Sequence, residues 1–571
     1  MFLLVLQWSR SHGRESVSCK DRQTPVRAVA VRAMIGKDMK FYNFRTHSGV
    51  RFFSPPTSLL SKKPLGDVVA HNITTHENRR EVLDEHADGY YWHRRMSSAF
   101  QLRTSMVEVA KPGIKRKSMA SDDRVILNGA AGIRARKAFE RQAEDASKCA
   151  AFLQDYWSER QDPQAVELSN GFSGQCVIES KNFFNFFHFM TESLQKASFP
   201  ESHDASIKSL RFVSRTNEIR PFVKSWLEDS GLTRRFKVRL GAYHEGEDFS
   251  GKSIVTPLSA QHLLYQFSGD HHAAIEAAQP AGGKWAGYDA HPHAVKILAL
   301  NTFDDTLLAF RQQMIDLAGS LVNRKWGSRI YVARSGDKAR SRVMEGEDAL
   351  IAKLQKNGFE VVCFENMSPL EQVRCVSGAR CVVMQHGAGM SNMIFARENA
   401  HFFEIGTYQT AMVRWKEFIP LSHVAGCHYH HIFANMDFGD ETHPVFDEDG
   451  LVAPRLDGDL VEKVVSIIKT SLKDRNPGGL SGMVRQCEYF AGREAYKHAY
   501  RLLDVNAEFY ENTGEYWMMR ALLNERTSHP NAAANNAYHA WTISGDERAW
   551  TEFVRLSRDD DPRRHRYAIN T

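Results

Sequence analysis

Between residues 329 and 406, short apolar runs alternate with stretches in which apolar residues recur every three or four positions. The runs predict buried strands, and the helical spacing predicts helices between them. The expected strands are 329–333, 359–364, 381–384 and 401–405, and the expected helices are 345–357, 368–378 and 390–396. Strands and helices that alternate in this way form right-handed βαβ units around an open parallel sheet. We therefore predict an α/β fold with a Rossmann-like domain in this region.

Two local signals mark the ends of these helices. Ser368 and Glu371 have the spacing of a capping box, in which each side chain bonds the backbone amide of the other residue. Pro369 suits the first helical position, because its missing N–H would be unpaired there in any case. Gly358 is placed to end the preceding helix, since glycine readily adopts the left-handed conformation of a helix C-terminus.

A similar but weaker alternation precedes this region. Strands are expected at 175–179, 210–214, 236–240 and 253–256, with helices at 184–199 and 219–229. Residues 261–294 are rich in His, Gly and Ala and lack periodicity, which predicts a loop over an interdomain cleft. A long amphipathic helix at 304–322 then leads into the second half. This pattern predicts a first Rossmann-like domain.

The two ends of the chain differ from the centre. Residues 1–150 show little regular pattern, and we expect an irregular, partly ordered lead-in there, followed by a helix at 130–156. Residues 476–482 have the composition of a linker. Helices are expected after it at 483–503, 507–524, 532–542 and 547–556, with a spacing loosely that of helical-hairpin repeats. We expect this helical appendage to contact a protein partner or a second copy of the chain. The predicted domains are 1–160, 161–320, 321–475 and 483–571.

Composition excludes several classes of protein. The 571 residues include 74 Lys and Arg and 68 Asp and Glu, with no long basic block, so nucleic-acid binding is not indicated. The eight cysteines form no C-x-x-C pair and are interpreted as reduced packing residues. The apolar run at residues 1–8 is too short for a signal peptide or a transmembrane segment. We expect a cytoplasmic protein, either free or peripheral to the inner membrane.

The loop after the predicted strand 381–384 is the strongest candidate for a ligand site. Gly387 and Gly389 have no Cβ, so a ligand can approach the backbone, and the next helix presents free amides. A phosphate fits such a site. A dinucleotide-binding loop would need a small residue where Asn392 stands, and a hydrolase elbow would need glycine at Met393. The remaining alternative is a structural turn that binds no ligand.

Candidate metal ligands have simpler explanations. Asp457 and Asp459 form a D-x-D pair of carboxylates that could bind a divalent metal ion, but Asp459 directly precedes a predicted helix, where an acidic cap is favourable. Histidine pairs at 271–272 and 291–293 lack a carboxylate or Cys at zinc spacing. Residues 427–432 predict a strand-like edge with three histidines, either solvated or lining a pocket. We predict no metal and no cofactor.

His188 and Glu192 are separated by four positions in a predicted helix, so they share one face. Together they could hold a proton in general acid–base catalysis. The alternative is a hydrogen-bonded core histidine, because phenylalanines surround His188 in the sequence and five of them between residues 183 and 189 indicate packing.

Several of these residues resemble the family 61 glycosyltransferases, known in bacteria as capsular polysaccharide biosynthesis proteins. The resemblance is carried by 331–335, Arg340, Arg342, Glu347, 358–362, Glu371, Gln372, 386–392 and 402–405, and more weakly by 185–192. The chain departs from the family pattern in having Phe186 and Phe187 for a tyrosine pair, Ala333 for serine, and 397–399 for Pro-Pro-Gly.

The resemblance implies two facing Rossmann-like domains of the GT-B type and an inverting transfer from a nucleotide-sugar donor to a glycan or polysaccharide acceptor. The implied nucleotide-sugar-binding residues are Arg334, Ser335, Arg340, His386, Gly387, Ala388, Gly389, Met390, Asn392 and Glu404. On the acceptor side, His188 is the first candidate for the catalytic base and Glu192 the second. The alternative function is a non-catalytic nucleotide-sugar-binding or scaffold subunit of a polysaccharide assembly.

Overall fold

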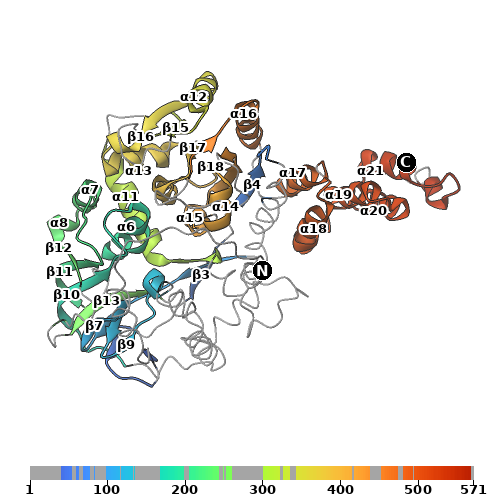
Figure 1. Cartoon of the computed structure of the whole chain (residues 1–571). Helices are drawn as coiled ribbons and strands as arrows, with labels where there is room; N and C mark the ends of the chain where they lie inside the picture. The colour runs from blue at the N-terminus through green and yellow to red at the C-terminus, as the bar shows by residue number, and fades with distance from the viewer. Residues whose placement is uncertain are drawn as a thin grey trace, which may run out of the picture. The chain divides into compact units, whose positions relative to one another are not determined.

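The structure is a computed structural model. It describes residues 40–44, 46–54, 59–63, 68–76, 83, 98–115, 118–132, 134, 167–198, 205–243, 249, 253–259, 300–321, 326–334, 343–414, 417–436, 452–473, 480–492 and 494–566. The fold lies within Phe41–Thr571, which forms one compact unit. The fold is mixed α/β, with several sheets and many helices (Figure 1).

A six-stranded sheet, here called the second sheet, contains the strands predicted between residues 329 and 406. Its order is β16 (Glu360–Cys363), β15 (Arg329–Ala333), β17 (Cys381–Gln385), β18 (His401–Gly406), β19 (His428–Phe433) and β4 (Val68–Asn72). All neighbouring strands are parallel. The predicted parallel sheet is therefore confirmed in this part of the chain.

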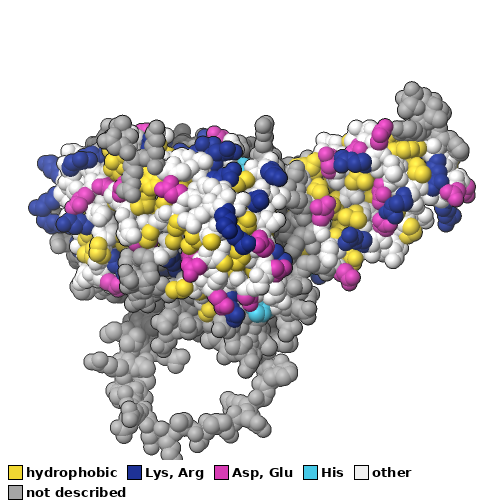
Figure 2. All heavy atoms as spheres, turned by 90° about the horizontal axis from the view of Figure 1, so that it is seen from above, with side chains coloured by type: hydrophobic (Ala, Val, Ile, Leu, Met, Phe, Trp, Pro, Cys, Tyr) yellow, Lys and Arg dark blue, Asp and Glu magenta, His cyan; other side chains and the backbone are white. Residues whose placement is uncertain are grey.

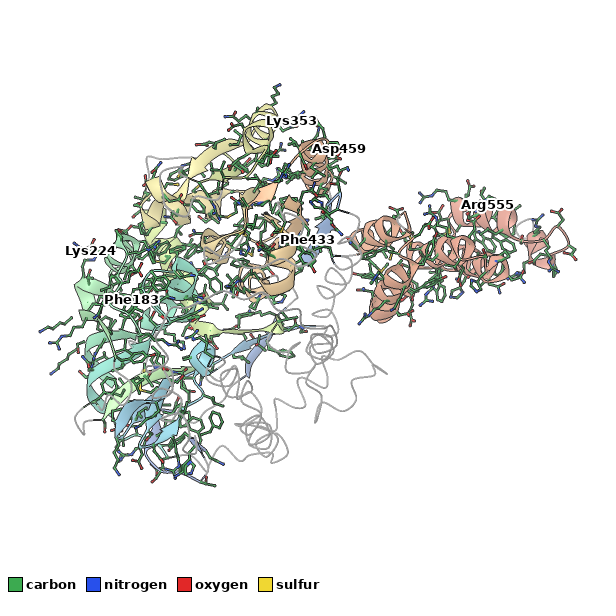
Figure 3. The ribbon with its side chains drawn as sticks, viewed as in Figure 1. Phe183, Lys224, Lys353, Phe433, Asp459 and Arg555 are labelled. Carbon is green, nitrogen blue, oxygen red and sulfur yellow. The ribbon has the colours of Figure 1, made fainter. Side chains whose placement is uncertain are left out.

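Helices pack on both faces of the second sheet. Tyr331 of β15 lies in one core cluster with Leu350 of α12 (Glu347–Lys356) and Val464 of α16 (Leu460–Ser471). The next residue, Val332, lies in another cluster with Val373 of α13 (Pro369–Gly378). Successive strand residues point to opposite faces, so a run of apolar residues fits a sheet buried on both sides. Figure 3 labels Lys353 of α12 and Asp459 at the start of α16, which lie on the same side of this sheet.

The predicted helix ends of this region are confirmed. Glu371 N donates to Ser368 Oγ at 3.3 Å, and Ser368 N donates to Glu371 Oε2 at 2.9 Å, which completes the capping box of α13. Gly358 follows α12 with φ +78°, in the left-handed region expected at a helix C-terminus.

A second six-stranded sheet, here called the first sheet, precedes it in the sequence. Its order is β12 (Lys237–Ala242), β11 (Ala205–Ser214), β10 (Phe172–Glu179), β13 (Ile254–Ser259), β6 (Thr104–Val109) and β2 (Val50–Phe52). The first four strands are mutually parallel, whereas β6 pairs antiparallel with both β13 and β2. The neighbouring helices are α6 (Phe186–Glu192), η3 (Leu194–Ser198), α7 (Pro221–Asp229), α8 (Leu232–Arg235) and α11 (Asp305–Gly319).

Where the structure describes residues 40–134, strands occur that the sequence pattern did not predict. They supply β2 and β6 to the first sheet and β4 to the second. This region also contains β1 (Lys40–Phe41), an antiparallel group of β7 (Pro112–Lys115), β8 (Ser118–Ser121) and β9 (Arg124–Val125), and a sheet of β3 (Leu59–Lys63) and β5 (Ala99–Leu102) with β14 (Thr302–Asp304). These strands are short, and distant partners stabilise them, so local periodicity does not reveal them. Most of the predicted helix 130–156 and the loop 261–294 lie outside the described residues.

The prediction of an edge strand at 427–432 is wrong. Strand β19 lies inside the second sheet, between β18 and β4, and all six of its residues are buried. His428, His430 and His431 are therefore core residues and not solvated ones. The reason is that β4, which comes from far earlier in the chain, covers the edge.

Shorter elements connect these sheets to the C-terminal part. They are η5 (Phe364–Asn366), η6 (Ala388–Phe395), α14 (Tyr408–Val413), α15 (Ile419–Ala425), and the paired strands β20 (Asn435–Met436) and β21 (Pro454–Arg455). None of the helices in the described part of the chain has the length and hydropathy of a membrane span.

The C-terminal part is helical, as predicted, but its first helix is divided. It consists of α17 (Leu480–Ala491), α18 (Tyr496–Tyr510), α19 (Gly514–Arg526), α20 (Pro530–Ser544), α21 (Glu547–Leu556) and η7 (Pro562–Arg566). The break lies between Ala491 and Tyr496, and Glu494 within it has φ +59°. Basic, acidic and hydrophobic side chains are interspersed on the face of these helices seen in Figure 2.

These helices recur at a regular interval. Helices α17 and α19 begin at Leu480 and Gly514, and α18 and α20 begin at Tyr496 and Pro530, so each pair is offset by 34 residues. Small buried residues recur at the same interval, as Ala499 in α18 and Ala533 in α20 show. An interval of about 34 residues is typical of stacked helical hairpins.

Candidate active site

The loop that follows β17 is shaped by the contact between Gly387 and Arg334. Gly387 has extended backbone with φ 170°, so its backbone conformation does not require glycine. A Cβ at this position would instead collide with Nη2 of Arg334, which donates a hydrogen bond to the carbonyl oxygen of His386. At Gly389 a Cβ would lie 2.9 Å from Cε of Met384. The two glycines therefore allow the loop to pack closely on β17 and on Arg334.

The helix after this loop begins earlier than predicted and is a 3₁₀ helix. It is η6 (Ala388–Phe395), whereas the sequence predicted a helix at 390–396. Met390 N donates to Gly387 O at 3.0 Å, which makes the first bond of the turn. The amides of Ala388 and Gly389 precede that bond, so the helix itself leaves them without an acceptor. They are the candidate anion-binding amides of the loop.

Asn392 and Met390, both predicted to bind the nucleotide sugar, are fully buried. Nδ2 of Asn392 donates to Gln372 Oε1 and to Gly389 O, each at 3.2 Å. Asn392 thus ties the loop to α13. Two further predicted residues, Ser335 and Arg340, lie outside the described residues.

Glu404 lies beneath the loop as a buried carboxylate. It is 0% exposed, and it accepts hydrogen bonds from Nδ1 of His386 and from the hydroxyl of Tyr429. Burial alone would raise the pKa of Glu404, but the positive charge and hydrogen bonds of the surrounding side chains outweigh it and lower the pKa to about 2. His431 Nδ1 lies 3.8 Å from the same carboxylate, and burial lowers the pKa of His431 to about 4. Glu404 is therefore ionised at neutral pH and His431 is neutral.

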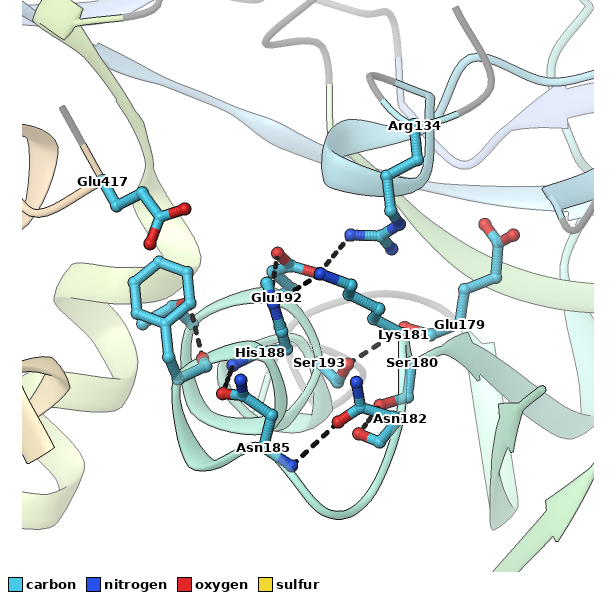
Figure 4. Close-up of polar contacts among 12 residues, drawn as sticks. Arg134, Glu179, Ser180, Lys181, Asn182, Asn185, His188, Glu192, Ser193 and Glu417 are labelled. Carbon is cyan, nitrogen blue, oxygen red and sulfur yellow. Dashed lines mark hydrogen bonds and ion pairs between the residues drawn. The ribbon is translucent and has the colours of Figure 1, made fainter. Parts of the chain in front are cut away.

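A second histidine–carboxylate pair lies on α6, where the sequence predicted it. His188 Nδ1 is 2.7 Å from Glu192 Oε1, and Arg134 donates to Glu192 Oε2 at 2.6 Å (Figure 4). Burial raises the pKa of Glu192, but the hydrogen bond from His188 and the charge of Arg134 lower it overall to about 2. Lys181 Nζ lies 2.7 Å from the other ring nitrogen of His188. These four side chains form one continuous chain of contacts.

Helix α6 begins at the carboxyl end of β10, where an open parallel sheet binds ligands. Asn185 caps it by accepting from His188 N at 3.4 Å, and Asn182 Oδ1 accepts from Asn185 N at 2.8 Å. The nearby phenylalanines pack as predicted, since Phe183 and Phe189 are fully buried with ring centroids 6.3 Å apart. His188 is thus a hydrogen-bonded histidine, and it is also part of the row of contacting charged side chains.

Phe418 joins the two histidine sites. Its ring centroid is 5.5 Å from that of Phe187 and 5.7 Å from that of His386. Phe187 in turn lies 5.2 Å from the His188 ring. Helix α6 and η6 are in direct contact. The structure therefore brings together the two segments that the sequence analysis placed on opposite sides of one site.

Sequence reasoning missed Lys181, Arg134, Phe418 and Tyr429 as neighbours of these histidines. Each comes from a different segment, and none belongs to a recognisable motif. A weak signal existed only for Lys181, which follows a predicted strand closely, as binding residues in this fold class often do.

The acidic residues of the D-x-D sequence have protein partners. Asp457 Oδ1 accepts from Asn435 Nδ2 at 2.8 Å, and Asp459 forms an ion pair with Lys463 at 2.9 Å at the start of α16. Among the described residues, no group of three or more His, Cys, Asp or Glu side chains is arranged to hold a metal ion. Independence from metal remains a prediction.

Comparison with known proteins identifies the central part of the chain. Residues 176–403 match the family model described as Glycosyltransferase 61. The match runs from β10 to β18 and includes both His188 and His386. No curated protein matches the chain. Residues 176–403 of the chain are therefore similar to the glycosyltransferase 61 family.

Proposed function

We propose that the chain is an inverting glycosyltransferase that moves a sugar from a nucleotide-sugar donor to a glycan or polysaccharide acceptor in capsular or cell-surface polysaccharide synthesis. The observation that carries this proposal is the meeting of two histidine–carboxylate pairs, His188–Glu192 and His386–Glu404, around Phe418. Residues 161–320 would form the acceptor-side domain and 321–475 the donor-side domain of a GT-B arrangement. His188 and Glu192 follow β10 of the first sheet, whereas His386 follows β17 of the second sheet and Glu404 lies in β18 beside it, which supports this division.

On the donor side, the site must stabilise a diphosphate whose negative charge grows as it leaves. The amides of Ala388 and Gly389 and the guanidinium of Arg334 supply positive potential at the loop. We assign Nε2 of His386 to a hydrogen bond with the diphosphate, while Nδ1 is hydrogen-bonded to Glu404.

Glu404 takes a different role from the one the sequence suggested. Because it has no exposed surface and both oxygens accept bonds from the protein, we assign it to orienting His386 and balancing its charge. Direct contact between Glu404 and sugar hydroxyls is not part of the proposal.

On the acceptor side, an inverting transfer needs a base that takes the hydroxyl proton while the acceptor oxygen attacks the anomeric carbon from the face opposite the diphosphate. The chain of contacts through His188 and Glu192 provides it. Glu192 is ionised and held by Arg134, so it can balance a proton gained by the histidine.

Metal would not be required, because cationic and amide groups stand where the diphosphate charge develops. A thermal-shift and calorimetric screen of nucleotide sugars and free nucleotides tests the proposal, since a ligand that binds only the native state raises its melting temperature. Binding of a nucleotide sugar followed by transfer to an oligosaccharide supports it. Binding without transfer to any acceptor would favour a scaffold subunit, for which the recurring C-terminal helices offer a contact surface for a partner or a second copy.

A further inference from the structure

Lys181 contacts Nε2 of His188, the ring nitrogen with which a catalytic histidine base would accept a proton. Because Glu192 is ionised, Nδ1 of His188 carries the ring proton and donates it to that carboxylate at 2.7 Å. Nε2 then holds the lone pair, and it accepts from the Lys181 ammonium at 2.7 Å. Both ring nitrogens of His188 therefore already have hydrogen-bond partners in the protein, and neither can accept a proton directly from a sugar hydroxyl.

Lys181 is also the more accessible of the two residues. His188 is 9% exposed and lies on the first turns of α6, whereas Lys181 is half-buried in the loop between β10 and α6. Figure 4 shows the Lys181 side chain extending from this loop toward Glu192 and His188. The lysine thus forms the outer end of the chain of contacts.

Charged groups from several segments face Lys181. Burial lowers its pKa, Glu192 and Glu417 raise it, and Arg134 and Arg414 lower it, with a net lowering. Arg414 and Glu417 also pair with each other at 2.7 Å, which reduces the influence of both. The surroundings therefore favour the neutral form of Lys181 more than water does.

We propose, building on the proposed glycosyl transfer, that Lys181 is the group that takes the proton of the acceptor hydroxyl, and that His188 with Glu192 holds the proton that Lys181 must first release. An ammonium nitrogen has no lone pair, so it cannot act as a base until it loses a proton. His188 Nε2 lies within hydrogen-bond distance to receive that proton.

Lys181 passes a proton from Nζ to Nε2 of His188, and the resulting imidazolium is paired with Glu192. Neutral Nζ takes the hydroxyl proton as the acceptor oxygen bonds to the anomeric carbon. The bond from that carbon to the diphosphate oxygen breaks, and the diphosphate leaves with the electron pair. One of the two protons on Lys181 and His188 returns to water before the next turnover.

The first test needs no turnover. The full-length protein is treated with limiting acetic anhydride across pH 6 to 11, and acetylation of each lysine is followed by mass spectrometry. Lys181 is expected to become reactive at a lower pH than the exposed lysines of the same protein. Titration of Lys181 together with the exposed lysines would overturn the proposal, because neutral Nζ would then be too rare.

The second test uses two variants of Lys181. Lys181→Arg keeps the hydrogen bond to His188 but cannot act as a base, and Lys181→Ala removes both functions. Both are expected to lower kcat by roughly 10²- to 10⁴-fold with unchanged nucleotide affinity. Methylamine should restore part of the turnover of Lys181→Ala and none of that of Lys181→Arg, which a purely structural role would not produce.

Two failures are distinguishable. Full turnover in Lys181→Ala, with loss of turnover in His188→Ala, would show that His188 acts directly and would overturn the role of Lys181 alone. Absence of nucleotide-sugar binding by the unmodified protein in calorimetry would contradict glycosyl transfer itself.

Discussion

In the proposed mechanism the donor side depends on Glu404, which is a fully buried charge balanced by its neighbours. Replacing it by glutamine keeps the shape but removes the negative charge beside His386. We expect Glu404→Gln to weaken nucleotide affinity by about tenfold or more, since a hydrogen bond to a charged group contributes roughly 1.5 to 3 kcal/mol. Calorimetry measures this. Tyr429→Phe is the control, because it removes one hydrogen bond to Glu404 and leaves its charge; equal affinities in wild type and Glu404→Gln would contradict the assignment.

His431 makes the stability of the protein depend on pH. Its folded-state pKa is lowered to about 4 from 6.5, so between these values the unfolded chain binds a proton that the folded chain does not. The stability from this group is full above pH 6.5 and is lost as the pH falls toward 4, by roughly 3 kcal/mol in total. Chemical unfolding at pH 7 and 4.5 measures the loss. His431→Gln should reduce the slope, and an unchanged slope in that variant would show that other groups cause it.

Residues that belong to a motif could be predicted, and residues brought together by folding could not. His188, Glu192, His386 and Glu404 were candidates from spacing and resemblance, and the structure places them in two pairs. The positions of Lys181, Arg134 and Phe418 beside the histidines depend on tertiary contacts between distant segments. Local sequence patterns do not reveal such contacts.

Among the elements, the loop between β17 and η6 requires glycine at position 387. The reason is the lack of space for a Cβ, and not the backbone conformation. Gly387→Ala is expected to displace Arg334 and to lower the free energy of unfolding by about 1 to 3 kcal/mol, as overpacking does. Gly378→Ala is a matched control, because a Cβ there meets nothing within 4 Å.

A double-mutant cycle sharpens this test. In an Arg334→Ala background the new Cβ has room, so Gly387→Ala should then cost little stability. Thermal unfolding of the four proteins gives the coupling. Additive effects of the two substitutions would contradict the contact as the reason for glycine.

The elements themselves were predictable where the signals are local. The capping box of α13 and the apolar runs of β15, β17 and β18 depend on neighbours in sequence. Strands such as β4 and β2 become strands because they complete sheets whose other members lie far away in sequence. The interior position of β19 depends on the same kind of long-range pairing. The sequence analysis therefore wrongly predicted its histidines to lie at a sheet edge.

For the whole molecule, the proposed mechanism requires no metal ion, because it assigns Arg334, His386 and two amides to stabilise the developing charge. Transfer is expected to proceed at an unchanged rate in excess EDTA, measured as release of nucleotide diphosphate in the presence of acceptor. Loss of activity in chelator that returns with Mn²⁺ would show that a metal site had been missed.

The central claim is that two histidines of one site have different tasks, His386 on the donor and His188 on the acceptor side. The most direct measurement is nucleotide-sugar affinity by calorimetry, alongside turnover, for His386→Ala and His188→Ala. The account predicts a loss of affinity of roughly ten- to a hundredfold in the first, and unchanged affinity with kcat lowered by roughly 10² to 10⁴ in the second. Equal loss of affinity in both variants, or full turnover in a normally folded His188→Ala, would contradict it.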